Sequence, residues 1–600
     1  MVAPAVFDIE TSQWTEFLFG GVLDSDGARI YDWPQEDEYV DDLLSIEGEI
    51  FGHNSGKFDA LWLLRHLFRR GIDFVPIISG ASMIALQVKG GPCFVDSFRL
   101  APMALAKFAV AFADRDKRKQ DSPIPYEDYS RDDTQYHAAI KDYLRADLAA
   151  LQSALAGLAR FVGERGWQLR RTIGASAWAT AQQRLELPDA SWPRRQYDWA
   201  RSGYFGGRVT VGRTRAPRIK CADINSAYPA ALARTKVPVG VPYWVDHASI
   251  DYGLGRDGIF GATVEVPESF CPPLPLRSGD GARLGYPTGT LRGRWTGLEL
   301  RHAEEHGCRV SVHRGLVWKS SAAIFEGFVQ DVWDARAEVI AREPDGKDHP
   351  RAHWIKLFAN SLTGRFAMDP EGESFACGDH GERAWCRAKH KVKHGADKPC
   401  PRERCCEHLC ARTCGRWSVF GHPDLRLYSY PYWRIGDSAH VHYAAYLTAA
   451  TRTQLHSEMR GDFVYSDTDS VKHLDHMPAD VGPALGQWED EGDGRDWHCL
   501  APKTYKYYSE KKEKNIVKAK GIPTAAKHWE KLIAGDAVPI DGVHSIKSAL
   551  RGGSKEPFQR RELTRTIKPS SERIGDRILL ADGSTRPPTI GEFEKGECER

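Results

Sequence analysis

The stretch Tyr-Ser-Asp-Thr-Asp-Ser at residues 465–470 constrains the fold of this chain more than any other feature. It lies between the apolar run 463–465 and Val471, a pattern that predicts the tip of a β-hairpin. Two carboxylates two residues apart at such a tip, Asp467 and Asp469, repel each other and lose solvation energy if they are even partly buried. A divalent cation relieves this conflict, because Mg²⁺ prefers carboxylate oxygens and bridges them to phosphates. On these residues alone, an Asp- and Ser-rich turn in solvent accounts for the stretch equally well.

Length and composition limit the class of protein. At 600 residues the chain is too long for one hydrophobic core, so we expect about three to five domains. Hydrophobic residues make up 42% and charged residues 27%, which is typical of a soluble globular protein. Neither a membrane-length apolar run nor a signal-peptide pattern is present, so we expect a cytoplasmic protein without a membrane partner. The net charge of +1 neither favours nor excludes nucleic acid, since local patches decide that.

Acidic residues recur at intervals through the first 150 residues. Asp8 and Glu10 fall at i and i+2 of a predicted strand, which places both on one face. Asp59 precedes an amphipathic helical pattern, and Tyr143 and Asp147 share a helix face at i and i+4. Four acids that converge from strand and helix are what a two-metal phosphodiesterase site requires. In such a site the hydroxyl of Tyr143 could orient the attacking water.

Two motifs follow in the middle of the chain. In Tyr-Phe-Gly-Gly at 204–207, the paired glycines let a backbone approach a phosphodiester closely, although a simple tight turn explains them equally well. Asp223 follows a predicted strand and adds a third carboxylate to the pair at 467 and 469. Tyr228 precedes Pro229, which predicts extended backbone geometry and a fixed ring direction beneath a nucleotide sugar. Packing at a strand–helix corner is the alternative for Tyr228, but it leaves Asp223 unexplained.

Residues 352–366 have the pattern of a helix. Lys356, Asn360 and Thr363 fall at i, i+4 and i+7, which is one face, and apolar residues cover much of the remainder. A lysine on such a face suits a triphosphate as a mobile point charge, whereas any single lysine is ordinarily a surface residue. The prediction of a nucleotide-binding helix therefore rests on the three residues together, not on Lys356 alone.

These motifs together resemble those of family B DNA polymerases. Asp-x-x-Ser-x-Tyr-Pro at 223–229, Lys-x-x-x-Asn-Ser-x-x-Gly at 356–364 and the stretch 465–470 resemble motifs A, B and C, in that order. Lys-Thr-Tyr at 503–505 resembles the Lys-x-Tyr element that holds the primer terminus. The N-terminal acids resemble the Exo I, Exo II and Exo III motifs of DEDD-type 3′–5′ exonucleases. Tyr-Phe-Gly-Gly and the compact size resemble the protein-primed branch of small phages and linear replicons, and the resemblance spans about residues 5–525 through eight short motifs.

The resemblance implies a role for each residue of these motifs. The exonuclease metal ligands would be Asp8, Glu10, Asp59 and Asp147, with Tyr143 as a catalytic residue. The polymerase metals would be held by Asp223 and Asp469, with Asp467 beside them. The nucleotide site would comprise Tyr228, Lys356, Asn360, Thr363 and Tyr465. DNA contacts would come from Asn54, Phe58, Ser97, Phe98, Tyr204, Gly206, Gly207, Ser361, Gly364, Lys503 and Tyr505, although core packing is the alternative for Phe58 and Phe98.

One motif residue departs from the family. Thr363 stands where the family usually has tyrosine. Threonine is smaller and β-branched, so we expect a looser nucleotide pocket rather than an inactive one.

The implied fold is multidomain, α/β plus α+β: an RNase H-like exonuclease domain followed by a right-hand polymerase with palm, fingers and thumb. The expected boundaries are 1–167 for the exonuclease domain, 168–233 for the first part of the palm, 234–330 for the first terminal-protein-region insertion, 331–367 for the fingers, 368–419 for a Cys-rich basic insertion at the second terminal-protein-region position, 420–535 for the second part of the palm, and 536–600 for the thumb.

The Cys-rich insertion is a departure from the family. Seven of the 13 cysteines fall within 377–414, and ten Lys or Arg residues lie from 383 to 416. So short and polar a segment has little to bury, so a structural Zn²⁺ would stabilise it, and free thiols on a basic arm are the alternative. The candidate zinc ligands are Cys400, Cys405, Cys406, Cys410 and Cys414. The basic charge favours phosphate contact in either case.

The sequence therefore predicts a DNA-directed DNA polymerase with a proofreading exonuclease. The resemblance alone implies that a terminal protein primes it. Two Mg²⁺ or Mn²⁺ ions per active site are the expected cofactors. The expected partners are primer–template DNA, dNTPs, the terminal protein and a single-stranded DNA-binding protein, with the chain a monomer or a heterodimer with the terminal protein. If a phage encodes the chain, it would act in the bacterial host cytoplasm. A primer-independent family B polymerase, and a nuclease or DNA-binding factor with a degenerate synthetic site, remain as alternatives.

Overall fold

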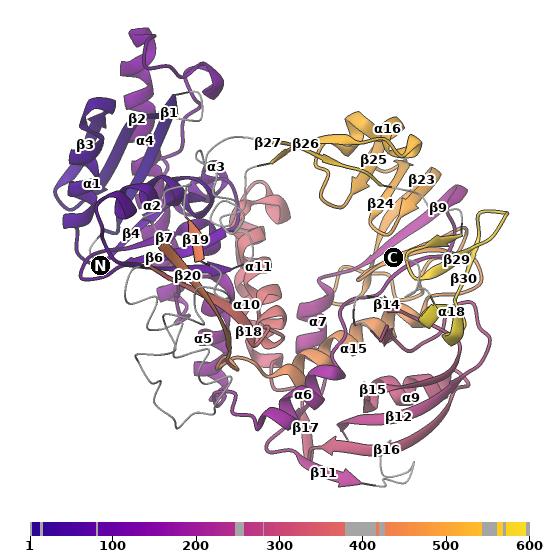
Figure 1. Cartoon of the computed structure of the whole chain (residues 1–600). Coiled ribbons are helices and arrows are strands. Elements are labelled where there is room, and N and C mark those ends of the chain that lie inside the picture. The colour runs from indigo at the N-terminus through magenta and orange to yellow at the C-terminus, as the bar shows by residue number, and fades with distance from the viewer. Residues whose placement is uncertain are drawn as a thin grey trace.

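The fold is described from a computed structural model of the 600-residue chain. The described residues are 3–12, 16–79, 82–246, 257–279, 281, 283–377, 416–418, 426–542, 561–567 and 572–595. Figure 1 shows the N-terminal residues on the left, a second large sheet with the C-terminal segments on the right, and the helices α10 and α11 between them. None of the helices in the described ranges is both long and apolar enough to cross a membrane.

The N-terminal domain is built on a mixed sheet that has seven strands in the described ranges. Its strand order is β3-β2-β1-β4-β7-β6-β5, with β1, β4 and β7 parallel to one another. The strands are β1 (Ala5–Ser12), β2 (Glu16–Asp24), β3 (Gly27–Asp32), β4 (Glu49–Gly52), β5 (Phe74–Ser79), β6 (Ser82–Val88) and β7 (Cys93–Asp96). The helices are α1 (Glu36–Ser45), α2 (Asp59–Arg69), α3 (Leu105–Phe112) and α4 (His137–Glu164).

The alternation of β1 decides where its acids point. Val6 packs in the cluster formed by α3 and α4, whereas Phe7 and Ile9 pack in the cluster on the opposite face, formed by α1 and α2. Because successive strand residues face opposite sides, Asp8 and Glu10 share the Val6 side and face α4. The aromatic and aliphatic residues of β1 therefore hold the two carboxylates in position.

The second large sheet, here called the palm sheet, is antiparallel in its described strands. Its order is β25-β24-β23-β9-β22-β21-β8. The strands are β8 (Val209–Val211), β9 (Arg215–Ile224), β21 (Phe463–Asp467), β22 (Ser470–His473), β23 (Trp488–Ala501), β24 (Thr504–Ser509) and β25 (Lys514–Ala519). The predicted hairpin at 465–470 is confirmed, since Asp467 pairs with Ser470 across its tip. Helices α7 (Ala227–Arg234) and α15 (Val441–Ser457) accompany this sheet.

An insertion separates the first strands of the palm sheet from the helical region. Its main sheet has the order β11-β16-β12-β15 and packs against α9 (Gly297–Glu305). The described strands of the whole insertion are β10 (Val237–Val239), β11 (Tyr243–Asp246), β12 (Gly258–Val266), β13 (Leu276–Arg277), β14 (Leu284–Gly285), β15 (Gly289–Thr296), β16 (Arg309–Val317) and β17 (Ser320–Ala322). The helix predicted at 352–366 is confirmed as α11 (Pro350–Phe366), which pairs with α10 (Glu326–Arg342).

A short antiparallel sheet follows α11. It comprises β18 (Glu371–Cys377), β20 (Arg426–Trp433) and β19 (Arg416–Ser418) in the order β18-β20-β19, and β18 lies beside β5 of the N-terminal domain. The candidate zinc ligands Cys400, Cys405, Cys406, Cys410 and Cys414 lie outside the described residues, so the zinc site stays a prediction.

The expected thumb range 536–600 divides between two places in the described structure. Strands β26 (Val538–Gly542) and β27 (Arg561–Arg565) pair with each other, and Val538 packs with α16 (Trp529–Ala534). The later elements instead contact the palm sheet and the insertion, since Thr585 Oγ1 donates to Val211 O at 2.6 Å and Arg577 donates to Phe270 O at 3.0 Å. These later elements are β28 (Arg573–Ile574), β29 (Arg577–Leu579), β30 (Thr585–Arg586) and α18 (Ile590–Lys595).

One apolar core joins the N-terminal domain to the helical region. Trp354 of α11 is fully buried, stacks on Phe358, and meets the rings of Phe112 and Phe161 edge-on. Its indole Nε1 donates to Leu100 O at 3.0 Å. Residues 172 to 185, including α5 (Ile173–Leu185), pack beside α11 as well. The helix that carries Lys356 is therefore anchored on the N-terminal domain.

We expect Trp354→Ala to lower the free energy of unfolding of this region by about 3–5 kcal/mol, because it leaves a cavity and an unpaired carbonyl. Trp33→Ala is the matched control, since Trp33 is 43% exposed and its loss should cost about 1 kcal/mol or less. Thermal and urea unfolding followed by tryptophan fluorescence measure both. Equal unfolding midpoints for the two variants would contradict the anchoring role of Trp354.

Candidate active sites

The acidic residues of the N-terminal domain meet in one pocket. Asp8 and Glu10 extend from β1, Asp59 begins α2, and Asp147 lies on α4 one turn after Tyr143. All five side chains line a cavity of about 290 Å³. The structure therefore brings together carboxylates that are up to 139 positions apart in the chain, counting from 8 to 147.

These carboxylates have little access to water and repel one another. Burial, then repulsion by Asp59, Glu10 and Asp147, raises the pKa of Asp8 well above its usual value. Burial and the charge of Asp147 raise the pKa of Glu10 to about 8, and burial raises the pKa of Asp59 to about 7. At neutral pH the pocket therefore holds protons that a dication would displace, as expected of a site for divalent metal.

Lys119 belongs to this pocket, although the sequence analysis missed it. Its Nζ donates hydrogen bonds to the hydroxyl of Tyr143 and to Asp147 Oδ2. The hydroxyl of Tyr126 contacts that of Tyr143 as well. Lys119 lies in the connection between α3 and α4, where no strand or helix spacing relates it to the acids. The basic run 115–119 was the one available signal.

Of the residues expected to contact a single-stranded 3′ end, some line the pocket and others lie beside it. Asn54 and Phe58 line it, and Asn54 is exposed with a left-handed backbone, φ 60°. Phe98 is partly exposed, and its ring centroid lies 5.8 Å from that of His53, another residue of the pocket wall. These three positions are open to a ligand, and their DNA contacts stay a prediction.

Ser97 is enclosed beneath this pocket, and its DNA contact stays a prediction. It is fully buried at the start of a 3₁₀ turn, Ser97–Arg99. Its hydroxyl donates to Gly52 O at 3.0 Å and lies 2.9 Å from His53 Nδ1. Ser97 therefore orients His53 from below the pocket.

The three carboxylates of the palm sheet lie together at one end of the strands β9, β22 and β21. Asp223 is near the end of β9, Asp467 ends β21, and Asp469 lies in the connection to β22. Backbone hydrogen bonds fix them, since Asp469 N donates to Asp467 O and Ile224 N donates to Asp469 O, each at 2.7 Å. Thr468 between the two acids has φ 62°, a strained value for a β-branched residue, and its N–H donates to Arg208 O at 2.7 Å.

The electrostatics of this second site match those of the first. Burial, then repulsion by Asp469 and Glu491, raises the pKa of Asp223 to about 8. Burial and the charge of Asp467 raise the pKa of Asp469. The positive charge of Lys356 lowers both pKa values in part, so Lys356 lies close to both acids.

Lys503 contacts the third acid. Its Nζ forms an ion pair with Asp467 Oδ1, and its backbone N–H donates to the hydroxyl of Tyr465 at 3.0 Å. Tyr465 is fully buried, and its ring packs on Trp497 and Tyr505, so its place in the nucleotide site stays a prediction. Tyr505 is only 8% exposed in the same cluster, so its contact with a primer stays a prediction.

A pocket of mixed charge lies around Lys356. It has a volume of about 690 Å³, and its charged lining comprises Lys356, Arg336 and Lys347 with the acids Asp348, Glu489 and Asp490. Lys347 pairs with Glu489 at 3.6 Å. Helical spacing predicted Lys356, whereas no motif in α10 distinguishes Arg336 from a surface arginine. Arg336 Nε is buried and has no hydrogen-bond partner among the described residues.

The remaining residues of α11 point in different directions. Asn360 and Ser361 are partly exposed, and Ser361 Oγ donates to Phe358 O at 2.8 Å. Thr363 is 5% exposed, and its hydroxyl has no hydrogen-bond partner within the described residues. Gly364 is exposed, and a Cβ there would meet nothing within 4 Å.

Tyr228 corrects the prediction of extended geometry. It is the second residue of α7, and Pro229 is the third. Proline is tolerated there because the first N–H groups of a helix have no partner within it. Tyr228 still lies near the acids and near Tyr204, since the charges of Tyr204 and Asp469 contribute to a pKa raised to about 12, mainly by burial.

The glycine pair of the 204–207 loop has two separate environments. A Cβ on Gly207 would lie 2.7 Å from the side chain of Thr468, so the absence of a side chain lets the loop pack on the acidic hairpin. A Cβ on Gly206 would meet nothing within 4 Å, and Gly206 is exposed. Gly206 thus leaves the surface open, while Gly207 serves protein packing.

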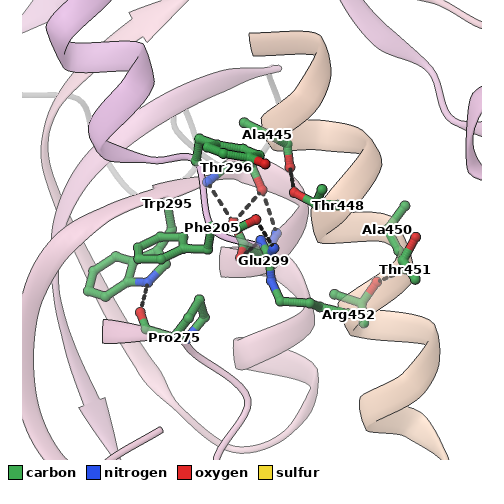
Figure 2. A network of polar contacts seen from close by, with 12 residues as sticks. Phe205, Pro275, Trp295, Thr296, Glu299, Ala445, Thr448, Ala450, Thr451 and Arg452 are labelled. Carbon is green, nitrogen blue, oxygen red and sulfur yellow. Dashed lines mark hydrogen bonds and ion pairs between the residues drawn. The ribbon is translucent and has the colours of Figure 1, made fainter. Parts of the chain in front are cut away.

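A buried ion pair holds this loop in place. Figure 2 shows Arg452 of α15 beside Glu299 of α9, with Nη2 donating to Glu299 Oε1 at 2.6 Å. Arg452 Nη1 also donates to the carbonyl oxygens of Phe205 and Gly206. Glu299 in turn accepts from Thr296 Oγ1 at 2.8 Å in a capping box. The insertion, helix α15 and the 204–207 loop therefore share one polar network.

Comparison with known proteins gives matches over most of the chain. The family model described as DNA polymerase type B, organellar and viral, matches residues 43–399. A probable DNA polymerase of Neurospora intermedia is 23% identical over 54% of this chain and 39% of its own length, so the chain spans well under half of that relative. The DNA-directed DNA polymerase of Enterobacteria phage PRD1 is 25% identical over 78% of this chain and 75% of that protein.

The fold is that of a solved phage polymerase. The structure of Phi29 DNA polymerase complexed with primer-template DNA and incoming nucleotide substrates superposes with a TM-score of 0.71 at 17% identity, covering 94% of this chain and 100% of that chain. This chain belongs to the family of organellar and viral type B DNA polymerases.

We expect divalent metal to bind with release of protons near neutral pH, because the raised pKa values of Glu10 and Asp223, each about 8, keep them partly protonated. Without metal, the folded state binds more protons than the unfolded state between the usual carboxyl pKa near 4.5 and about 8, so stability falls as pH rises through that window. Added Mg²⁺ should restore it. Calorimetric Mn²⁺ titration in two buffers of different ionisation enthalpy counts the protons. The account is contradicted if metal binding releases no protons at pH 7. It is also contradicted if Glu10→Gln releases as many protons as wild type.

We expect Glu299→Gln to destabilise the chain by about 3–5 kcal/mol, because it leaves the charge of Arg452 buried without its counter-ion. The pair is 3% and 2% exposed. Asp198→Asn is the matched control, since it removes the partner of Arg194 in an exposed pair and should cost about 0.5 kcal/mol or less. Urea unfolding at low ionic strength compares the two. Similar midpoints would show that the network contributes little.

Proposed function

We propose that this chain is a DNA-directed DNA polymerase with a 3′–5′ exonuclease, which replicates a phage or linear-replicon genome with strand displacement from a protein primer. The observation that carries the proposal is that Asp223 and Asp469 meet at one end of the palm sheet, near the positive charge of Lys356. A second acidic site in the N-terminal domain supplies the exonuclease. Membership of the type B family supports both assignments.

In the proposed polymerase site, basic residues would bind the triphosphate and acidic residues would bind the metal ions. Lys356 and Arg336, which line the same pocket, would bind the triphosphate, whereas Lys347 pairs with Glu489 of that pocket. Polymerases of this family use divalent metal ions, and Asp223 and Asp469 would hold two Mg²⁺ or Mn²⁺ ions that stabilise charge on the attacking and leaving oxygens. Their raised pKa values fit that role, because a dication favours the ionised form.

Tyr228 and Lys503 would position the sugar of the incoming nucleotide and the end of the primer. Tyr228 lies in the first turn of α7, near Tyr204, at a position that suits the sugar of the incoming nucleotide. Lys503 pairs with Asp467, at a position that suits the phosphate of the primer end. Thr363 is buried and small, so it offers a base pair no aromatic surface.

In the exonuclease site, two residues of the chain are placed for proton and water positioning. Asp8, Glu10, Asp59 and Asp147 would hold the ions that activate water. The hydroxyl of Tyr143 would orient that water, and Lys119 fixes the hydroxyl by donating to it. The Lys119 charge also offsets part of the carboxylate repulsion that raises the pKa of Glu10.

A basic groove on the insertion supports the binding of DNA and of a priming protein. It has a volume of about 820 Å³, and its lining includes Arg277, Arg292, Arg294 and Arg314 but no acidic side chain in the described residues. Arg277 Nη2 donates to Tyr204 O, so the groove begins at the 204–207 loop. Arginines with aromatic neighbours bind phosphates and acidic surfaces well. A single-stranded DNA-binding protein and the terminal protein are the proposed protein partners, with the chain a monomer or a heterodimer.

We expect Asp469→Asn to lower primer extension about a thousandfold or more, since it removes a metal ligand worth several kcal/mol in the transition state. Asp8→Asn should retain extension and lose degradation of the 3′ end. Asp142→Asn is the matched control on the same helix as Asp147, where Asp142 is 74% exposed. The assay follows a labelled DNA primer on a longer template with Mg²⁺, with and without dNTPs.

Three outcomes of that assay contradict parts of the proposal. A wild-type chain that only degrades DNA would indicate a nuclease with a degenerate synthetic site. Synthesis on a bare template without any primer would indicate a primer-independent polymerase. Loss of both activities in Asp8→Asn would show that the two sites are not separate.

A further inference from the structure

Three histidines outside both acidic sites lie close together where α9 of the insertion meets α15. His302 lies in the last turn of α9, His306 caps the end of that helix, and His456 lies in the last turn of α15. One nitrogen of each ring lies within 4.8 Å of the other two. The ring centroids are 4.2, 4.8 and 4.9 Å apart, so the rings surround one point.

Hydrogen bonds to backbone carbonyls set two of the three tautomers. His456 Nε2 lies 2.8 Å from Cys271 O, and His306 Nδ1 lies 2.7 Å from His302 O. A carbonyl oxygen only accepts, so these two nitrogens carry the hydrogens. His456 Nδ1 and His306 Nε2 therefore present lone pairs. Metal-ligating histidines are ordinarily oriented by such a hydrogen bond from the other ring nitrogen.

The third ring is the one that would change on metal binding. His302 Nε2 lies 2.8 Å from His456 Nδ1, and because His456 Nδ1 carries a lone pair, His302 Nε2 donates its hydrogen there. Coordination would require that hydrogen to move to Nδ1 of the same ring, with no net proton released. The two nitrogens would also separate slightly, since ligands about 2.0–2.1 Å from a tetrahedral ion are more than 3 Å apart.

Burial and charge around the cluster favour neutral imidazoles. His302 and His456 are 8% and 7% exposed, while His306 is exposed and leaves one side open to solvent. Burial, then His306 and Arg208, lowers the pKa of His302 to about 4. The cluster lies at the C-terminal ends of two helices, where carbonyl groups favour a cation.

One charge opposes a cation at this point. The guanidinium of Arg208 lies close enough to depress the pKa of both His302 and His456. It is engaged elsewhere, since its Nε donates to Thr210 Oγ1 and its Nη1 donates to Pro272 O. Asp576 interacts electrostatically with the same arginine and offsets part of its charge.

We propose that His302, His306 and His456 form a binding site for a transition-metal dication, Zn²⁺ in the cell, with a fourth position open to water. Three neutral imidazoles suit Zn²⁺ and exclude Mg²⁺, which requires oxygen ligands. The ion would connect α9 to α15, the two helices that also carry Glu299 and Arg452. Its effect would be to stiffen the support of the 204–207 loop, independently of the catalytic metals.

The test is a Co²⁺ titration of the metal-free full chain, in excess Mg²⁺ to fill the carboxylate sites. A histidine site gives visible d–d bands of a four-coordinate ion without the near-ultraviolet charge-transfer bands of thiolate ligands. The presence or absence of the thiolate charge-transfer bands therefore distinguishes a site in the Cys-rich segment from the histidine site. We expect His306→Gln to weaken the histidine-type binding at least about tenfold, and Zn²⁺ to raise the unfolding midpoint of wild type but not of His306→Gln.

His313→Gln is the matched control, since His313 is an exposed histidine of β16 in the same insertion. It should bind Co²⁺ as wild type does. Circular dichroism of each variant checks the fold, and His306 is exposed enough for substitution to be tolerated. The proposal is overturned if wild type shows no histidine-type spectrum at micromolar Co²⁺, if only thiolate bands appear, or if His306→Gln binds as tightly as wild type.

Discussion

Repulsion between carboxylates that are held together away from water is the constraint on which this structure depends. In both sites the framework, not the acids, fixes the separation. Phe7 and Ile9 anchor β1 so that Asp8 and Glu10 face α4, and two backbone hydrogen bonds of 2.7 Å hold Asp469 against β9 and β21. The acids cannot move apart, so their pKa values rise until a cation is supplied. Each site is in this sense built for a ligand that carries positive charge.

Polar networks connect these sites to the surrounding structure. Lys119 joins Tyr143 to Asp147 in the N-terminal pocket, and Lys503 joins Asp467 to the palm core through Tyr465. Where the insertion meets α15, Arg452 holds the 204–207 loop by the carbonyl oxygens of Phe205 and Gly206 (Figure 2). Because that arginine is neutralised by a glutamate of the insertion, the position of the loop depends on two segments far apart in the chain.

Apolar packing also joins the N-terminal domain to α11. Trp354 of α11 donates to Leu100 O and packs with aromatic rings of the N-terminal domain. The same helix carries Lys356, whose charge lowers the pKa of Asp223 and of Asp469. Because α11 and the N-terminal domain share a core, this packing fixes the position of Lys356 relative to the acidic pocket of that domain.

The sequence by itself determined the local elements and the chemistry that they carry. Strand alternation placed Asp8 and Glu10 on one face, apolar flanks predicted the hairpin at 465–470, and helical spacing predicted α11, because short-range periodicity dictates each of these. Tertiary structure alone decided which side chains meet. Lys119 and Arg336 have no spacing relative to the acids, Ser97 and Tyr465 are buried by residues distant in sequence, and Tyr228 is helical because its proline falls in a first turn. The histidine cluster likewise joins residues 302 and 456, and only the packing of α9 on α15 brings them together.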